Sequence, residues 1–160
     1  MEPTYPVNVR DLNKDSEYYD EVMEMNSRAE EYLMEFKWCD KVFKDDTMLY
    51  YNLGNKLCVF TLHIINNQSS DEADNKLWVI TGDLPNMNLD TYNVTSLKDA
   101  LENYADLAAA WADGVLAGES LEDCYMFDEE PTAELATMLK SRVEFMRDNI
   151  IVDLEDILLV

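Results

Sequence analysis

The sequence predicts an α+β fold: one long helix, then a small antiparallel sheet of three or four strands, then two or three helices. Apolar residues recur at spacings of three and four near the start of the chain and again over about residues 96–150, which is the helical period. Between these stretches, residues 38–94 are rich in Tyr, Val, Phe and Ile and are interrupted by turn sequences. Helices grouped apart from strands favour an α+β domain.

The first segments are an irregular arm and a helix. Pro3 and Pro6 interrupt residues 1–13, and the remaining residues 14–160 are predicted to form a single domain, because 48% apolar content in 160 residues is enough for one core. Asp15 or Ser16 is a suitable N-cap for a helix that reaches about Phe36. The helix is expected to pack through one apolar stripe: Tyr18, Val22, Met25, Ala29, Tyr32, Leu33 and Phe36.

The middle of the chain predicts the sheet. Gly54-Asn55 is a strong hairpin signal, and the strand that follows it is apolar on both faces, which is typical of a central strand. A polar loop over residues 66–75 precedes the next strand. The predicted strands are Met48–Leu53, Lys56–Ile65, Lys76–Thr81 and, more weakly, Asn88–Val94. Gly82 is interpreted as a residue that the geometry of the turn after the third strand requires, with a functional Gly82-Asp83 turn as the alternative.

The remaining residues predict helices. Thr95 or Ser96 caps a helix that Gly118 closes, and Pro131-Thr132 opens a second one that extends to about residue 150. Residues 151–160 keep an apolar helical spacing. This tail is expected to pack on the domain or on a second copy, because several large apolar side chains in water favour aggregation.

Charge is the strongest indication of function. The chain has 34 Asp and Glu against 12 Lys and Arg, a formal net charge of −22, and residues 99–160 hold sixteen of the acids and three of the bases. Such a surface disfavours direct binding to nucleic acid or to an anionic membrane. It favours a basic protein partner, whose association it would accelerate. The alternative is that the acidic surface serves only solubility.

The residues that commonly carry catalysis or bind metal form no motif. His63 is the single histidine, and Cys39, Cys58 and Cys124 fit neither a disulfide framework nor a zinc site, so we interpret them as reduced core thiols. No stretch fits a calcium-binding loop. We therefore predict no enzyme activity, cofactor or metal. The N-terminus lacks a signal peptide and no segment is long enough to span a membrane, which predicts a cytoplasmic protein.

Four segments carry a resemblance to a known family: Glu35–Cys39 (EFKWC), Leu77–Pro85 (LWVITGDLP), Pro131-Thr132 and Leu139–Phe145 (LKSRVEF). Through them the chain resembles an uncharacterised family of small, acidic, single-domain bacterial proteins. The resemblance implies a stand-alone bacterial cytosolic protein and brings no established activity. In composition alone, the chain also resembles immunity proteins, which neutralise toxins by occluding them.

The leading hypothesis is an interaction protein that binds and inhibits a basic partner, most concretely an immunity protein against a bacterial toxin. Tyr50 and Tyr51 are adjacent on a strand and therefore point to opposite faces, so at least one is expected to be an exposed anchor. The acidic candidates are Glu21, Glu24, Glu31, Glu35, Asp123, Asp128, Glu129 and Glu130. The alternatives are a small enzyme or ligand-binding domain with a pocket near Trp78, Asp83 and His63, and a subunit of a structural homo-oligomer such as a homodimer.

Overall fold

The computed structural model describes residues 5–160 and confirms an α+β fold with an antiparallel sheet. The chain divides into two compact units: unit 1 comprises residues 1–97 and 157–160, and unit 2 comprises residues 98–156. The chain passes from one unit to the other after residue 97 and again after residue 156. Neither place has the Pro-, Gly- or Ser-rich composition of a linker. Among residues 5–160, no helix combines the length and the apolar character that crossing a lipid bilayer requires.

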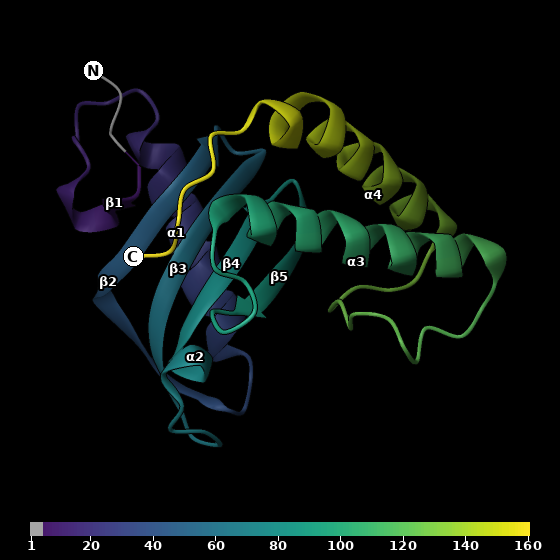
Figure 1. The fold of residues 1–160 in the computed structure, drawn as a ribbon, viewed down its shortest axis with the longest axis horizontal. Helices are drawn as coiled ribbons and strands as arrows, with labels where there is room; N and C mark the ends of the chain where they lie inside the picture. Colours follow the sequence, from purple (N-terminus) through teal and green to yellow (C-terminus); the bar gives the residue numbers. More distant parts are fainter. Residues whose placement is uncertain (1–4) are drawn as a thin grey trace. The chain divides into compact units, whose positions relative to one another are not determined.

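The sheet of unit 1 has five strands rather than three or four, in the order β1-β2-β3-β4-β5, and every neighbouring pair is antiparallel. Figure 1 shows this meander. The strands are β1 (Val7–Asn8), β2 (Cys39–Leu53), β3 (Leu57–Asn66), β4 (Lys76–Gly82) and β5 (Leu84–Asp90). The predicted hairpin is confirmed between β2 and β3, where Gly54 has a φ of 54° that an L side chain adopts only at a cost.

One helix, α1 (Tyr19–Met34), packs on the sheet and builds the core of unit 1. Its predicted apolar stripe is confirmed, because Val22, Met25, Ala29 and Leu33 are all buried. They pack against alternate residues of β2, β3 and β4, which point to the face of the sheet that α1 covers. These sheet residues are Leu49, Cys58, Phe60, Leu62, Ile64, Leu77 and Val79.

Three local predictions for unit 1 are wrong. The arm is not irregular throughout, because β1 pairs with Met48 and Leu49 of β2 and adds an edge strand before α1. The polar loop contains a short helix, α2 (Glu72–Asn75), which Asp71 caps by accepting a hydrogen bond from the N–H of Ala73. The weak fourth strand lies four residues earlier than predicted, as β5, because it pairs with β4 directly across the Gly82 turn.

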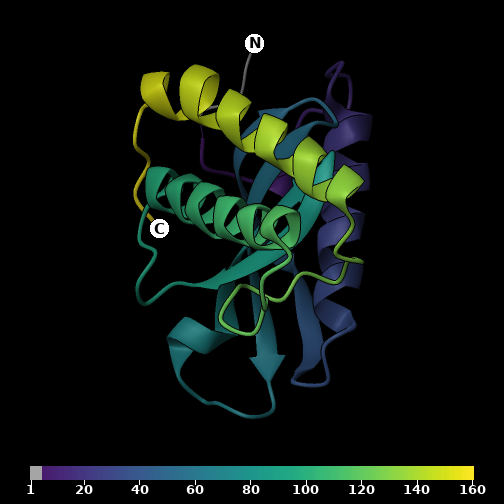
Figure 2. The same ribbon diagram turned by 90° about the vertical axis from the view of Figure 1, so that its right-hand side faces the viewer.

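Unit 2 contains the two long helices α3 (Leu97–Ala117) and α4 (Ala133–Phe145), which lie side by side in Figures 1 and 2. An ion pair joins them, from Lys140 to Asp113 at 2.8 Å, and Arg147, just after α4, pairs with Asp106 of α3 at 2.9 Å. Both predicted termini are confirmed. Gly118 ends α3 with a φ of 67°, and the Thr132 hydroxyl caps α4 by accepting a hydrogen bond from Leu135 N–H.

The end of the chain differs from its predicted helical form. After α4 the chain continues as a π-helical turn (Met146–Ile150) and a 3-10 turn (Ile151–Asp153), and then becomes extended. Residues 157–159 return to unit 1 and pair with residues 95–97: the N–H of Leu97 donates to Ile157 O, and the N–H of Leu159 donates to Thr95 O, both at 2.8 Å. Apolar spacing alone does not separate this extended pairing from a helix.

Candidate functional site

The candidate glutamates of α1 share one exposed stripe of the helix. Glu21, Glu24, Glu31 and Glu35 are separated by three, seven and four residues, so they lie on one face. All four are exposed. Arg28 occupies the same stripe, and its guanidinium donates to the main-chain oxygen of Gly82 at 3.2 Å. The stripe is therefore accessible, but a cation interrupts it.

The two candidate tyrosines are not exposed anchors. Tyr50 is completely buried: its ring lies 4.6 Å from that of Trp78, and its hydroxyl accepts a hydrogen bond from the N–H of Val160 at 3.1 Å. Tyr51 is half-buried. Burial raises the pKa of both phenols. Tyr50 therefore completes the interior of unit 1 and does not lie on its surface.

The other candidate acids lie in one connecting segment of unit 2. This acidic segment, residues 118–132, joins α3 to α4 and has six acids, all of them exposed, including Asp123, Asp128, Glu129 and Glu130. From residue 99 to residue 139 the chain has eleven acids and no Lys or Arg. Met126, in the middle of the segment, is 91% exposed. An exposed apolar side chain thus lies between acidic residues along the segment.

The acidic segment is anchored on α3. Phe127 is buried, and its ring lies 5.5 Å from that of Trp111, 6.2 Å from that of Tyr104 and 4.9 Å from that of Tyr125. The N–H of Glu119 donates to the carbonyl of Gly114 at 2.9 Å. Aromatic pairs at these separations contribute beyond simple area burial. Because Phe127 points inward, Met126 beside it is held outward.

Charge is concentrated in the unit that carries this segment. Unit 2 has sixteen acids and four Lys or Arg, a formal net charge of −12, whereas the larger unit 1 has eighteen acids and eight bases, a net charge of −10. Two of the four bases in unit 2, Lys140 and Arg147, already form ion pairs with aspartates of α3. The carboxylates of the acidic segment therefore have few internal cations to neutralise them.

The sequence matches the family described as Domain of unknown function (DUF4826) over residues 34–150. The chain belongs to this family. No curated protein and no solved structure matches it. The predicted resemblance to an uncharacterised family is confirmed by this match. The DUF4826 region contains the sheet from β2 onward, Glu35 and the whole acidic segment, whereas Glu21, Glu24 and Glu31 precede it.

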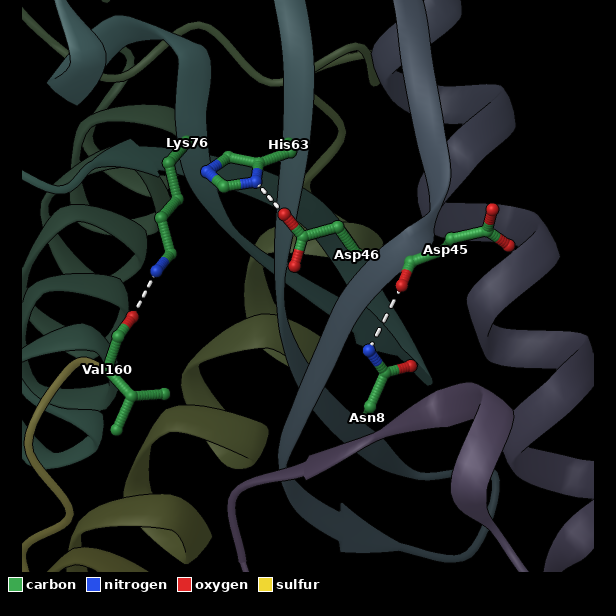
Figure 3. A network of polar contacts seen from close by, with 6 residues as sticks. All are labelled: Asn8, Asp45, Asp46, His63, Lys76 and Val160. Carbon is green, nitrogen blue, oxygen red and sulfur yellow. Dashed lines mark hydrogen bonds and ion pairs between the residues drawn. The ribbon is translucent and has the colours of Figure 1, made fainter.

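The single histidine of this DUF4826 protein is paired with a carboxylate. Figure 3 shows the His63 side chain on β3 turned toward Asp46 on β2, and its Nδ1 forms a hydrogen bond with the Asp46 carboxylate. The neighbouring Lys76 on β4 donates to the main-chain oxygen of Val160. Within residues 5–160, His63 has no hydrogen bond to a Ser, Thr or Cys that could act as a nucleophile. The pair joins two strands.

A common pocket for Trp78, Asp83 and His63 does not form. In the register of β3 and β4, His63 lies opposite Lys76, whereas Asp83 follows Gly82 at the other end of β4. A rise of about 3.3 Å per residue places His63 and Asp83 roughly 20 Å apart. Trp78 is buried between these ends, and its indole N–H donates to Val94 O at 2.8 Å. The residues that the small-enzyme alternative placed in one pocket therefore lie far apart in the sheet.

The thiols are suited to packing. Cys58 is buried in the core beneath α1, and burial raises its pKa to about 12 although the side-chain N–H of Asn52 donates to its sulfur at 3.0 Å. Burial also raises the pKa of Cys39. Cys124 in the acidic segment is half-buried. Within residues 5–160, no group of three His, Cys, Asp or Glu residues is arranged to hold a metal ion.

We expect the three cysteines to differ in their reaction with a thiol reagent. At pH 8, a pKa of about 12 leaves about one Cys58 in ten thousand as the reactive thiolate. Ellman's reagent should therefore label Cys124 first in the native protein, and Cys58 only when the protein unfolds. The Cys124→Ser variant should lose the rapid phase. Rapid native labelling of Cys58 would contradict its buried environment.

Proposed function

We propose that this protein binds and inhibits a basic protein partner, and that the partner is a bacterial toxin, so that the protein acts as an immunity protein in the cytoplasm. The observation that carries this proposal is the acidic segment. Its six exposed acids flank the exposed Met126 in the sequence, in a stretch of the chain without Lys or Arg. Opposite charges steer the encounter of two proteins and orient them, which mainly raises the association rate.

Met126 supplies the apolar part of the proposed contact. Its side chain is 91% exposed, so a partner that covers it removes a large apolar surface from water. Methionine is flexible and polarizable, so it adapts to the shape of an apolar patch on the partner. In the proposed complex the carboxylates of the segment form a charged rim, whose individual contributions to affinity are smaller than that of a well-buried anchor. In this complex the acids steer the partner toward the segment, and Met126 slows its dissociation.

Two matched variants test which acidic surface is used. The partner is first isolated from the protein's own cells by affinity purification and identified. One variant replaces Asp123 and Asp128 by Asn and Glu129 and Glu130 by Gln, and the other replaces Glu21, Glu24, Glu31 and Glu35 by Gln. Each variant removes four negative charges. We expect the first to slow association about tenfold or more at low salt, and the second to slow it much less.

Ionic strength and the Met126→Ser variant test the acids and Met126 separately. Raising the ionic strength to a physiological value should slow association with the wild type strongly and change its dissociation little. Met126→Ser should instead accelerate dissociation and leave the association rate nearly unchanged. An association rate that is insensitive to salt would contradict electrostatic steering. A partner that is itself acidic, or one whose activity survives saturating binding, would contradict the proposed inhibition.

A further inference from the structure

Unit 1 contains a cavity of about 490 Å³ at the end of the sheet where β3 ends and β4 begins. The strand register gathers residues that are distant in the sequence: Cys39, which follows Trp38, lies opposite Asn66, and Leu77 lies opposite Asp90. The helix α2, which carries Asp74, immediately precedes β4 at the same end of the sheet (Figure 1). Among the lining residues there is no Lys, Arg or His.

Trp38 gives the cavity an aromatic wall of fixed orientation. The rings of Trp38 and Phe36 are stacked, with centroids 4.7 Å apart and planes inclined by 20°. Phe36 in turn meets the ring of Tyr32 edge to face at 5.3 Å. Tyr32 is part of the buried core, so this series of rings connects the indole to α1. Indole is the side chain with the strongest attraction for a cation over its face.

Two carboxylates of the lining each retain an oxygen that no described contact occupies. One oxygen of Asp74 accepts a hydrogen bond from the Ser69 hydroxyl at 2.7 Å. One oxygen of Asp90 accepts the N–H groups of Tyr92 at 2.9 Å and Asn93 at 2.8 Å. These bonds orient the carboxylates. No Lys or Arg of residues 5–160 forms an ion pair with either of them.

We propose that this cavity binds the guanidinium group of an arginine. A guanidinium is a planar, weakly hydrated cation that stacks on an aromatic face and donates hydrogen bonds in the plane of the group to carboxylates. Trp38 supplies the face, and Asp74 and Asp90 supply the acceptors. The apolar stem of the arginine packs against Leu77 and Leu89, the two leucines of the lining. This inference goes beyond the proposed function, because the cavity lies in unit 1 and the acidic segment in unit 2.

Binding of a blocked arginine tests this inference in the intact chain of 160 residues. Nα-acetyl-arginine methylamide is titrated into the ¹⁵N-labelled chain, and the indole N–H signal of Trp38 is followed after assignment with Trp38→Phe. The comparison ligand is Nα-acetyl-citrulline methylamide, which has nearly the same shape and no charge. We expect a saturable shift with the arginine compound and at least tenfold weaker binding of the citrulline compound.

Variants of the two lining carboxylates test where the arginine compound binds. Asp90→Asn retains an oxygen that can accept the N–H groups of Tyr92 and Asn93, and Asp74→Asn changes the second carboxylate; each should weaken arginine binding several-fold. Asp20→Asn, an exposed change on α1 outside the lining, should leave binding unchanged. Equal binding of the citrulline compound, no saturable shift, or an equal loss in Asp20→Asn would overturn the inference. Because the ligand comparison uses the wild type, a variant that fails to fold leaves the test intact.

The source of the arginine is tested by adding free L-arginine. A blocked compound that binds at least as well as free L-arginine supports an arginine within a protein chain as the ligand. A clear preference for free L-arginine supports the amino acid itself, whose charged backbone groups would then contribute to binding. Either result supports a guanidinium site.

Discussion

Replacing Gly82 by alanine is expected to destabilise the protein by at least about 3 kcal/mol. Gly82 has a φ of 145°, a conformation that L side chains rarely adopt, and an added Cβ would lie 2.2 Å from the carbonyl oxygen of Lys56. That oxygen cannot easily move away, since it accepts the N–H of Asp83 at 2.9 Å where β3 begins. The melting temperature should fall by roughly 10 °C, at about 2–4 °C per kcal/mol.

Gly118→Ala is the matched control for this change. Gly118 also has a positive φ, 67°, but an added Cβ there would meet no atom within 4 Å. This substitution should cost only the conformational strain of about 1–2 kcal/mol. The difference between the variants measures the close approach to Lys56 O. Equal melting temperatures for the two would contradict the tight packing at the end of β4.

Deleting residues 151–160 is expected to lower the melting temperature by several degrees or more. The deletion removes the buried Ile151, whose burial contributes about 1.5–3 kcal/mol. It also removes the partners of Thr95 O and Leu97 N, and the N–H that donates to the Tyr50 hydroxyl. Each such hydrogen bond contributes about 0.5–1.5 kcal/mol. Thermal unfolding followed by circular dichroism measures the loss.

A point change in the same tail supplies the control. Leu158 is 69% exposed, so Leu158→Ser should change stability by no more than about 0.5 kcal/mol. Sedimentation of both proteins shows whether the tail also joins two copies, as the homo-oligomer hypothesis requires. If the truncated chain melts and sediments like the full one, the tail is not structural and becomes a candidate for contact with a partner.

Local chemistry predicted much of the fold. Gly54-Asn55 predicts its hairpin, and Gly118 and Thr132 predict the ends of α3 and α4, because each acts within a few residues of its own position. The strand β1 could not be predicted in the same way. It has only two residues, and its partners Met48 and Leu49 lie about forty residues further along the chain.

The candidate surfaces were predictable in part. Charged side chains remain in water, so the exposure of Glu21 or Asp128 follows from residue type alone. The alternation of a strand places Tyr50 and Tyr51 on opposite faces but does not reveal that Tyr50 is fully enclosed. No sequence pattern predicts the exposure of Met126, because it depends on the inward orientation of Phe127.

The pairing of residues 95–97 with residues 157–159 has a consequence for the order in which the protein folds on the ribosome. Synthesis proceeds from the N-terminus, so α1 and all five strands emerge first. The residues that complete their hydrogen bonding emerge only after the whole of unit 2 has been made. Until then, Thr95 O and the Tyr50 hydroxyl lack these native partners. Completion of the first unit is therefore a late event in biosynthesis, and ribosome-bound chains that stop before residue 157 should be more sensitive to proteases than released ones.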